Sequence, residues 1–121
     1  MIDIAICAAE ALQENARGIR FPITAFGTDA TGFVVRFQGK VYGYVNRCAH
    51  VSVELDWNEG EFFDASGMYL MCAVHGAMYL PESGRCAGGP CRGQALQKIH
   101  VFESQGQIFW TPDDSVRPVC A

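Results

Sequence analysis

Two short motifs, each of which pairs a cysteine with a histidine, most constrain what this chain can fold into. The first is Cys48-Ala49-His50, and the second is Cys72-Ala73-Val74-His75, which is followed directly by Gly76. A cysteine and a histidine this close on a tight loop can point into the same small volume, and both side chains are metal ligands. We therefore expect a fold in which two loops meet and each supplies one thiolate and one imidazole to a metal centre.

Outside the motifs, the sequence patterns are those of short strands and turns. Segments rich in β-branched and aromatic residues are typical of strands, and they cover residues 19–23, 33–37, 41–45, 68–71, 77–80, 99–102 and 107–110. Glycine-containing segments predict turns at 38–40, 64–67, 81–84 and 104–106. Only residues 8–15 favour helix, for one or two turns. About seven short strands predict an all-β barrel or sandwich, with each motif just after a strand at a loop tip.

The composition is that of a globular domain with many cysteines. The length of 121 residues predicts a single domain, residues 1–121, and the net charge of −4 argues against a nucleic-acid partner. No apolar stretch is long enough to span a membrane, and the acidic residues Asp3, Glu10 and Glu14 do not fit a signal peptide. Six cysteines without a secretion signal favour a metal or redox site in a reducing compartment, so we expect a cytoplasmic protein.

The motifs and their surroundings resemble those of the Rieske-type ferredoxins over roughly residues 18–110. That family has three loops in a fixed order: Cys-x-His, then Cys-x-x-His-Gly with an aromatic residue four positions after the histidine, then a Gly-Pro loop. The corresponding segments here are residues 46–50 with 54–56, residues 72–79 with 83–84, and residues 88–90 with Leu96. Together these motifs are specific, whereas a single Cys-x-x-His would not be.

The resemblance implies a Rieske fold, in which an antiparallel β base, a sandwich or barrel, carries a smaller cluster-binding subdomain. It implies one [2Fe-2S] cluster per chain, with Cys48 and Cys72 as ligands of the inner iron and His50 and His75 as ligands of the outer iron.

Three neighbours of the ligands also receive roles from the resemblance. Gly76 would let the backbone pass close to the bridging sulfides. Tyr79 would place its hydroxyl against a cysteine sulfur, and the Pro90 loop would cover the cluster from the side.

Three departures separate the chain from the respiratory-chain Rieske proteins. Val53 and Val74 occupy the positions of a disulfide that joins the two ligand loops in those proteins, and Ala77 replaces a serine that donates to a bridging sulfide. The respiratory proteins also have a membrane anchor, so the match is to the soluble ferredoxins that serve oxygenases. Because hydrogen bonds to the sulfurs favour the reduced cluster, Ala77 predicts a midpoint potential in the lower half of the span of roughly −150 to +300 mV.

Four protein ligands leave no coordination position for a substrate, which predicts an electron carrier and not an enzyme. We expect single electrons to pass from a reductase to an oxygenase-type acceptor, with no bound small-molecule substrate. The alternative is a small non-catalytic or redox-sensing subunit of a larger oxidoreductase complex.

Two surfaces are candidates for contact with redox partners. An apolar docking face could form beside the ligands, as suits weak redox contacts, from Val51, Val74, Met78 and Pro90. An acidic run could steer a basic reductase or simply be a solvated face, and it consists of Glu54, Asp56, Glu59, Glu61 and Asp64.

Two alternatives remain open at the ligand loops. The two cysteines and two histidines could instead hold a structural Zn²⁺, although Gly76, Tyr79 and the Gly-Pro segment favour the cluster. Cys86 and Cys91 could be free thiols, a disulfide that braces the covering loop, or a thiol switch, and a reducing compartment favours free thiols.

The other chemically notable residues are expected to be structural. Cys7 and Cys120 would be small buried side chains, and His100 would be a structural or surface residue. The remaining aromatic candidates for packing are Phe62, Phe63, Trp57 and Trp110.

Overall fold

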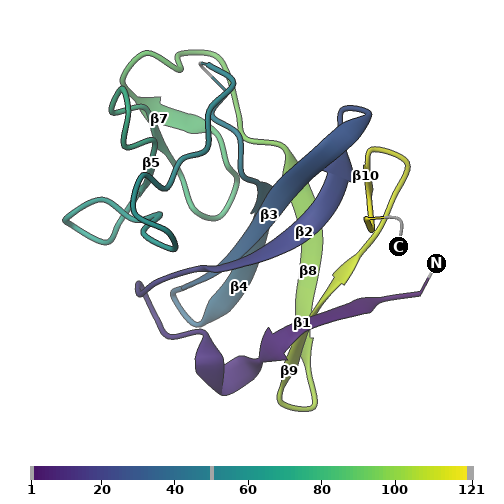
Figure 1. Cartoon of the computed structure of the whole chain (residues 1–121). Helices are drawn as coiled ribbons and strands as arrows, with labels where there is room; N and C mark the ends of the chain where they lie inside the picture. Colours follow the sequence, from purple (N-terminus) through teal and green to yellow (C-terminus); the bar gives the residue numbers. More distant parts are fainter. Residues whose placement is uncertain (1, 50, 120–121) are drawn as a thin grey trace.

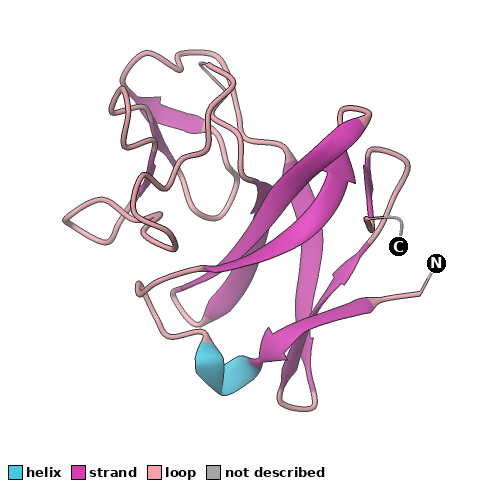
Figure 2. Ribbon diagram, in the orientation of Figure 1, coloured by secondary structure: helices cyan, strands magenta, loops and turns pink. Residues whose placement is uncertain are grey.

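The computed structural model describes residues 2–49 and 51–119, and its regular secondary structure is almost entirely antiparallel strands, joined by long loops in one part of the molecule (Figure 2). The larger sheet has the order β1-β9-β8-β4-β3-β2-β10, and the smaller one has the order β5-β6-β7. The larger sheet contains β1 (Ile4–Ala8), β2 (Ile19–Ala25), β3 (Thr28–Phe37), β4 (Lys40–Val45), β8 (Lys98–Ser104), β9 (Gln107–Thr111) and β10 (Val116–Arg117). The smaller one contains β5 (Leu70–Met71), β6 (Met78–Tyr79) and β7 (Cys86–Gly88). Within the described residues, no helix is long and apolar enough to cross a membrane.

Three two-residue turns connect neighbouring strands of the larger sheet. Phe26-Gly27 joins β2 to β3, Gln38-Gly39 joins β3 to β4, and Gln105-Gly106 joins β8 to β9. Both residues of each turn have positive φ, which defines the tight turn whose twist matches that of antiparallel strands. The twisted sheet curls into a barrel, so that β1 contacts β2 on the far side (Figure 1).

The two faces of β3 and β4 are buried in different cores, because successive side chains of a strand point to opposite sides. The barrel core consists of Leu12, Phe21, Ile23, Ala25, Val34, Val45, Ile99, Ile108, Trp110 and Val116. The subdomain core consists of Phe33, Val35, Tyr44, Cys48, Leu55, Phe62, Leu70, Cys72, Ala77, Tyr79, Cys91 and Leu96. The wall between the two cores is therefore only one sheet thick.

The smaller sheet and its loops form a subdomain that packs on the outer face of this wall (Figure 1). Phe62 stacks on Phe33, with ring centroids 3.9 Å apart. The buried Tyr44 hydroxyl donates to the Pro81 carbonyl at 2.6 Å. Burial raises the pKa of the Tyr44 hydroxyl, so that it remains a hydrogen-bond donor at any physiological pH.

The predicted β base with a smaller subdomain is confirmed, as are the strands at 19–23, 33–37, 41–45, 99–102 and 107–110. The prediction of helix over residues 8–15 is wrong in extent. Only Ala9–Ala11 forms a single 3₁₀ turn (η1), because the residues before it form β1 and pair with β9. The strand expected over 68–71 is reduced to β5, and Leu70 forms a single bridge with Phe63 across the predicted turn at 64–67.

Most of the residues expected to be structural are packed as predicted, with one exception. Trp110 and Phe62 are buried, Cys7 is only partly buried at the edge of the barrel core, and Cys120 lies outside the described residues. Trp57 is 80% exposed, so the expectation of a core aromatic was wrong there. The preceding residues, Leu55 and Asp56, turn their side chains inward, which leaves Trp57 facing outward.

Candidate metal centre

Three loops bring the two motifs together at one end of the molecule (Figure 1). Loop 1 (residues 47–53) follows β4, loop 2 (residues 72–77) connects β5 to β6, and loop 3 (residues 88–93) begins at the end of β7. Cys48 and Cys72 are buried at 3% and 0% exposure, whereas His75 is exposed. His50, the fourth predicted ligand, lies outside the described residues.

The two cysteines lie side by side, with Cys48 within hydrogen-bonding reach of Cys72. Burial raises the pKa of the Cys72 thiol, hydrogen bonds from the backbone N–H groups of Val74 and His75 lower it, and Cys48 raises it again. Two buried thiolates this close need a positive partner, and metal binding supplies one by displacing the protons. The donor set therefore fits a pair of thiolates on one iron. Among the described residues, no third His, Cys, Asp or Glu joins them in a single group.

Tyr79 contacts the first of these sulfurs as predicted. Its buried hydroxyl lies 3.2 Å from the Cys48 sulfur and accepts a hydrogen bond from the Ala49 N–H at 3.0 Å. Because the amide already donates to the oxygen and a thiolate can only accept, the hydroxyl proton points to the sulfur when Cys48 is a ligand. Tyr79 thus supplies a hydrogen bond to a ligand sulfur, whereas Ala77 has no hydroxyl that could donate one.

Two glycines shape the contact between loop 2 and loop 3. Gly76 has φ of 73°, and no protein atom lies within 4 Å of the place where its Cβ would be, so its left-handed backbone is what requires glycine. Gly89 has φ of 83°, and a Cβ there would lie 2.8 Å from the Gly76 carbonyl oxygen and 3.0 Å from the Ala77 Cα. Loop 3, with the exposed Pro90, therefore lies directly against the backbone that carries His75, which agrees with a covering loop.

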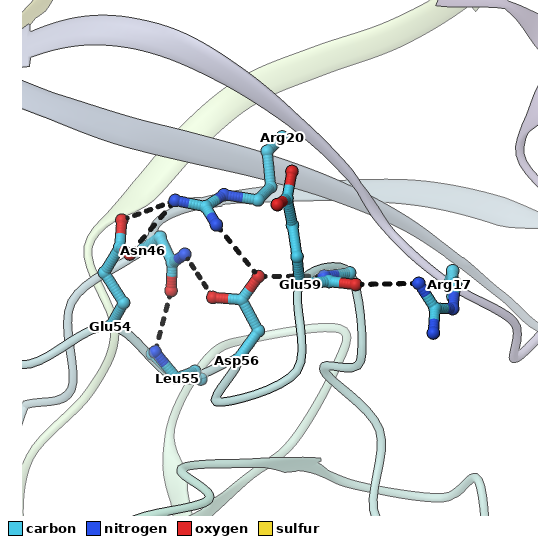
Figure 3. Close-up of polar contacts among 8 residues, drawn as sticks. Arg17, Arg20, Asn46, Glu54, Leu55, Asp56 and Glu59 are labelled. Carbon is cyan, nitrogen blue, oxygen red and sulfur yellow. Dashed lines mark hydrogen bonds and ion pairs between the residues drawn. The ribbon is translucent and has the colours of Figure 1, made fainter.

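A buried carboxylate anchors the segment that follows loop 1 (Figure 3). Asp56 accepts hydrogen bonds from the Asn46 side chain at 2.8 Å and from the Gly60 N–H at 2.9 Å. The same asparagine accepts from the Leu55 N–H, and the Arg20 guanidinium lies 3.6 Å from the carboxylate. These contacts join the end of β4 to the chain beyond loop 1, so they hold both ends of the loop that carries Cys48.

Three other acidic residues of the predicted run also form contacts within the protein, and Figure 3 shows the one made by Glu54. Glu54 forms an ion pair with Arg20 at 2.8 Å, and Glu61 forms one with Arg17 at 3.4 Å. Asp64 accepts hydrogen bonds inside its own turn. The run is thus mostly a set of structural contacts, which weakens the idea that it steers a basic partner.

Cys86 and Cys91 form a disulfide, so the expectation of free thiols was wrong. The expectation rested on the redox compartment, whereas the loop geometry decides the pairing. The turn through Gly88-Gly89-Pro90 reverses the chain and brings the two Cα atoms to 5.6 Å, a normal separation for a disulfide. Cys91 is buried in the subdomain core, which also contains Cys72 and Tyr79, so the bridge fastens loop 3 to that core.

The curled sheet and its three converging loops define a small β protein that holds a metal centre at one end. The model of the Rieske [2Fe-2S] domain matches residues 3–103, and the chain belongs to this family. It therefore carries one [2Fe-2S] cluster, which decides between the cluster and the zinc alternative.

Solved structures share the fold at low sequence identity. The ferredoxin of carbazole 1,9a-dioxygenase from Nocardioides aromaticivorans IC177 superposes with a TM-score of 0.73 at 20% identity, over 93% of this chain and 100% of that one. A chain of a complex of reduced oxygenase and oxidized ferredoxin of carbazole 1,9a-dioxygenase has a TM-score of 0.68 at 23% identity, over 90% of this chain and 92% of that one. The terminal oxygenase of carbazole 1,9a-dioxygenase from Novosphingobium sp. KA1 has a TM-score of 0.68 at 22% identity, over 93% of this chain but 30% of that one. No curated protein matches the sequence.

Proposed function

We propose that this protein carries single electrons from a reductase to an oxygenase-type acceptor, through a cluster held by Cys48, His50, Cys72 and His75. The observation that carries the proposal is the buried pair of cysteines, one of them hydrogen-bonded to Tyr79, beside an exposed histidine on the same loop. When bound, the cluster supplies a site that gains and loses one electron.

The residues around the site divide the work between burial and exposure. The buried cysteines, with hydrogen bonds from Tyr79 and from backbone N–H groups, keep water from the sulfurs and stabilise their negative charge. The exposed His75 gives the outer side of the site its contact with solvent and with a partner. Since all four proposed ligands come from the protein, no coordination position is left for a substrate at the metal.

The comparison of lengths also supports a separate carrier. This chain covers the whole of one solved ferredoxin but 30% of the chain of a terminal oxygenase, where the same fold is one part of a larger protein. That second occurrence keeps a subunit of a larger oxidoreductase complex as the other candidate. Size-exclusion chromatography of the native protein distinguishes them, because a carrier elutes as a small protein and a subunit co-purifies with a large one.

An anaerobic redox titration tests the carrier function. We expect a visible absorption spectrum that bleaches reversibly with one electron per chain, and a midpoint potential below about +150 mV, in the lower half of the Rieske span. Cys72→Ser should abolish the spectrum, whereas the matched variant Cys7→Ser, at the barrel edge, should retain it. A colourless protein with zinc, or a spectrum that Cys72→Ser leaves intact, contradicts the proposal.

The apolar face beside the ligands is part of the same proposal. Val74 and Pro90 are exposed, and Val51 and Met78 are half-buried. Met78→Asp should slow electron delivery to the acceptor while the cluster spectrum stays intact. An unchanged rate would remove this face from the docking surface.

Two further predictions belong to this proposal: a single domain over residues 1–121 and a cytoplasmic location. Limited proteolysis that leaves one resistant core, and detection of the protein in cytoplasmic cell fractions, are the expected results.

A further inference from the structure

The arginines of this protein divide into two groups by location. Those in or beside the barrel form ion pairs with carboxylates, and they are Arg17, Arg20, Arg36 and Arg117. Arg47 in loop 1, Arg92 in loop 3 and Arg85 between β6 and β7 are exposed and have no carboxylate partner among the described residues. Arg85 lies at the far end of the β6–β7 hairpin from loops 2 and 3, so Arg47 and Arg92 are the two at the site.

The three loops contain no acidic residue. All 13 Asp and Glu lie outside residues 47–53, 72–77 and 88–93, although the net charge of the chain is −4. A cluster with two thiolate and two neutral imidazole ligands is uncharged when oxidised and gains one negative charge on reduction, so it does not cancel two arginines. The three loops themselves therefore carry only positive side-chain charge on a protein that is negative overall, although Asp29 and Glu54, the latter paired with Arg20, line a second hollow beside Phe26 and Arg47.

Arg47 is held in place from two sides. Its guanidinium carbon lies 4.4 Å from the centroid of the Phe26 ring, and one of its N–H groups donates to the Ser52 hydroxyl at 2.7 Å. Phe26 is 53% exposed and occupies the first position of the β2–β3 turn with φ of 55°, which is uncommon for a bulky residue. Glutamines occupy this position in the other two turns, at residues 38 and 105. At this position the Phe26 ring replaces the glutamine side chain of the other two turns, and the Arg47 guanidinium lies over it.

A hollow of about 480 Å³ opens beside this pair. Phe26 and Arg47 form part of its wall, Cys48 of loop 1 forms another part, and Gln94 and Gln97 line it from the segment that leads into β8. A carboxylate that entered the hollow would meet a guanidinium and side-chain amides, and it would bring its own backbone against the loop of a predicted ligand.

We propose that Arg47, oriented by Phe26 and assisted by Arg92, is the docking point for Asp and Glu side chains on the surface of the redox partner of this protein. The proposal rests on the proposed carrier function and deepens it by giving the partner an acidic docking face. The acidic run led us to expect that negative charge on this protein attracts a basic partner. The proposal is the opposite, because positive charge on this protein would attract an acidic partner.

Two small oxidants of opposite charge test the local field without a partner. The reduced holoprotein is mixed in a stopped-flow instrument with ferricyanide or with tris(phenanthroline)cobalt(III), over a range of salt concentrations. We expect added salt to lower the rate of oxidation by the anionic ferricyanide and to raise the rate of oxidation by the cationic cobalt complex, because screening weakens attraction and repulsion alike. The opposite salt dependence, which the net charge alone predicts, would overturn the proposal.

Charge-reversal variants then locate the field. At low salt, Arg47→Glu should lower the rate of oxidation by ferricyanide about tenfold. Arg92→Glu should lower that rate severalfold, and the cluster spectra of both variants should be unchanged. Arg85→Glu is the matched control, because it changes the net charge equally at the other end of the hairpin, and it should change the rate less than about twofold. Equal effects of all three variants would mean that only the net charge matters and would refute the local site.

A protein probe tests docking itself. The rate of electron uptake from a reduced acidic flavodoxin should saturate as the flavodoxin concentration rises. Arg47→Glu should raise the flavodoxin concentration at half-saturation about tenfold, and Phe26→Ala should raise it to a smaller extent. Unchanged saturation in both variants refutes docking by a protein carboxylate. Millimolar citrate at constant ionic strength should compete with the flavodoxin, because both offer carboxylates to Arg47, and an absence of competition would overturn the site. Reversible reduction at an electrode reports on the carrier function separately.

Discussion

The barrel and the subdomain of this protein are stabilised in different ways. The barrel consists of long paired strands around an apolar core, and the arginines around it are matched by carboxylates. The subdomain has strands of two or three residues, and its loops depend on positive-φ glycines, a disulfide and buried polar contacts. Regular pairing suits a scaffold, whereas a site that must present ligands from three loops needs each loop fastened individually. The difference also extends to charge, since only the subdomain end leaves its arginines exposed and unpaired among the described residues.

The barrel core should carry the largest share of stability. Trp110 is 2% exposed and its ring centroid lies 5.4 Å from that of Phe21, so Trp110→Ala should lower the free energy of unfolding by about 3–5 kcal/mol. Denaturant unfolding followed by circular dichroism measures this. Phe109→Ala, on the same strand but half-exposed, is the control and should cost much less. Similar losses in the two variants would contradict the assignment of Trp110 to the core.

The disulfide should matter mainly to the subdomain. Replacing Cys86 and Cys91 together by alanine should cost about 2 kcal/mol, because the bridge closes a short loop in the unfolded chain. We expect the visible absorption of the cluster to decay faster on warming, with a smaller change in the unfolding of the barrel strands. Dithiothreitol should reproduce the effect in the wild type but add nothing to the double variant. Equal decay of the cluster in both proteins would show that loop 3 does not depend on the bridge.

Removal of one hydrogen bond at the cluster should have an effect of about 1 kcal/mol. Tyr79→Phe deletes the hydroxyl that lies 3.2 Å from the Cys48 sulfur. Because that bond favours the reduced, more negative state, its loss should lower the midpoint potential by about 40 mV. Protein-film voltammetry measures the shift, and Tyr42→Phe, on β4 outside the site, should leave the potential unchanged. A rise in potential would mean that the hydroxyl does not donate to the sulfur.

Relief of a strained turn should have the smallest effect, and it should stabilise the protein. Phe26→Asn places a residue that tolerates the left-handed conformation at φ of 55°, which should raise the free energy of unfolding by up to about 1 kcal/mol. Gln38→Asn in the sister turn should give a similar gain. Only the substitution at Phe26 should slow electron transfer to an anionic oxidant. If both variants leave that rate unchanged, the ring has no part in positioning Arg47.

The sequence predicts the two regions to different depths, for physical reasons. Runs of β-branched and aromatic residues identified the main strands of the barrel, because a half-buried strand needs them over several residues. Strands of two or three residues, such as β7 and β10, carry too little pattern and exist only because neighbouring segments fix them. The edge strand β1 was missed because alanines beside it favour helix locally, while its pairing with β9 is a contact across the whole chain.

The candidate site shows the same division. The spacing of the motifs was enough to place Cys48, Cys72 and His75 on loops at one end, and the contact of Tyr79 with Cys48 followed from the resemblance. The buried contacts of Asp56 and the position of Phe26 under Arg47 could not be read from the sequence, since each joins segments that are distant in the chain. A phenylalanine directly before a glycine, between two strand patterns, was the one available signal for the latter.

The two-residue turns also have a kinetic consequence. Strands β2, β3 and β4 follow one another with minimal connections, so their pairing closes only short loops and should be among the first structure to form. That early meander already contains the wall on which the subdomain packs, and loop 1 leaves it directly. A newly made chain should therefore possess a rigid platform, with its first cysteine in position, before any iron arrives. Cluster insertion would then be a late, local step on a nearly complete protein, and refolding of the apoprotein should proceed at the same rate with or without iron and sulfide.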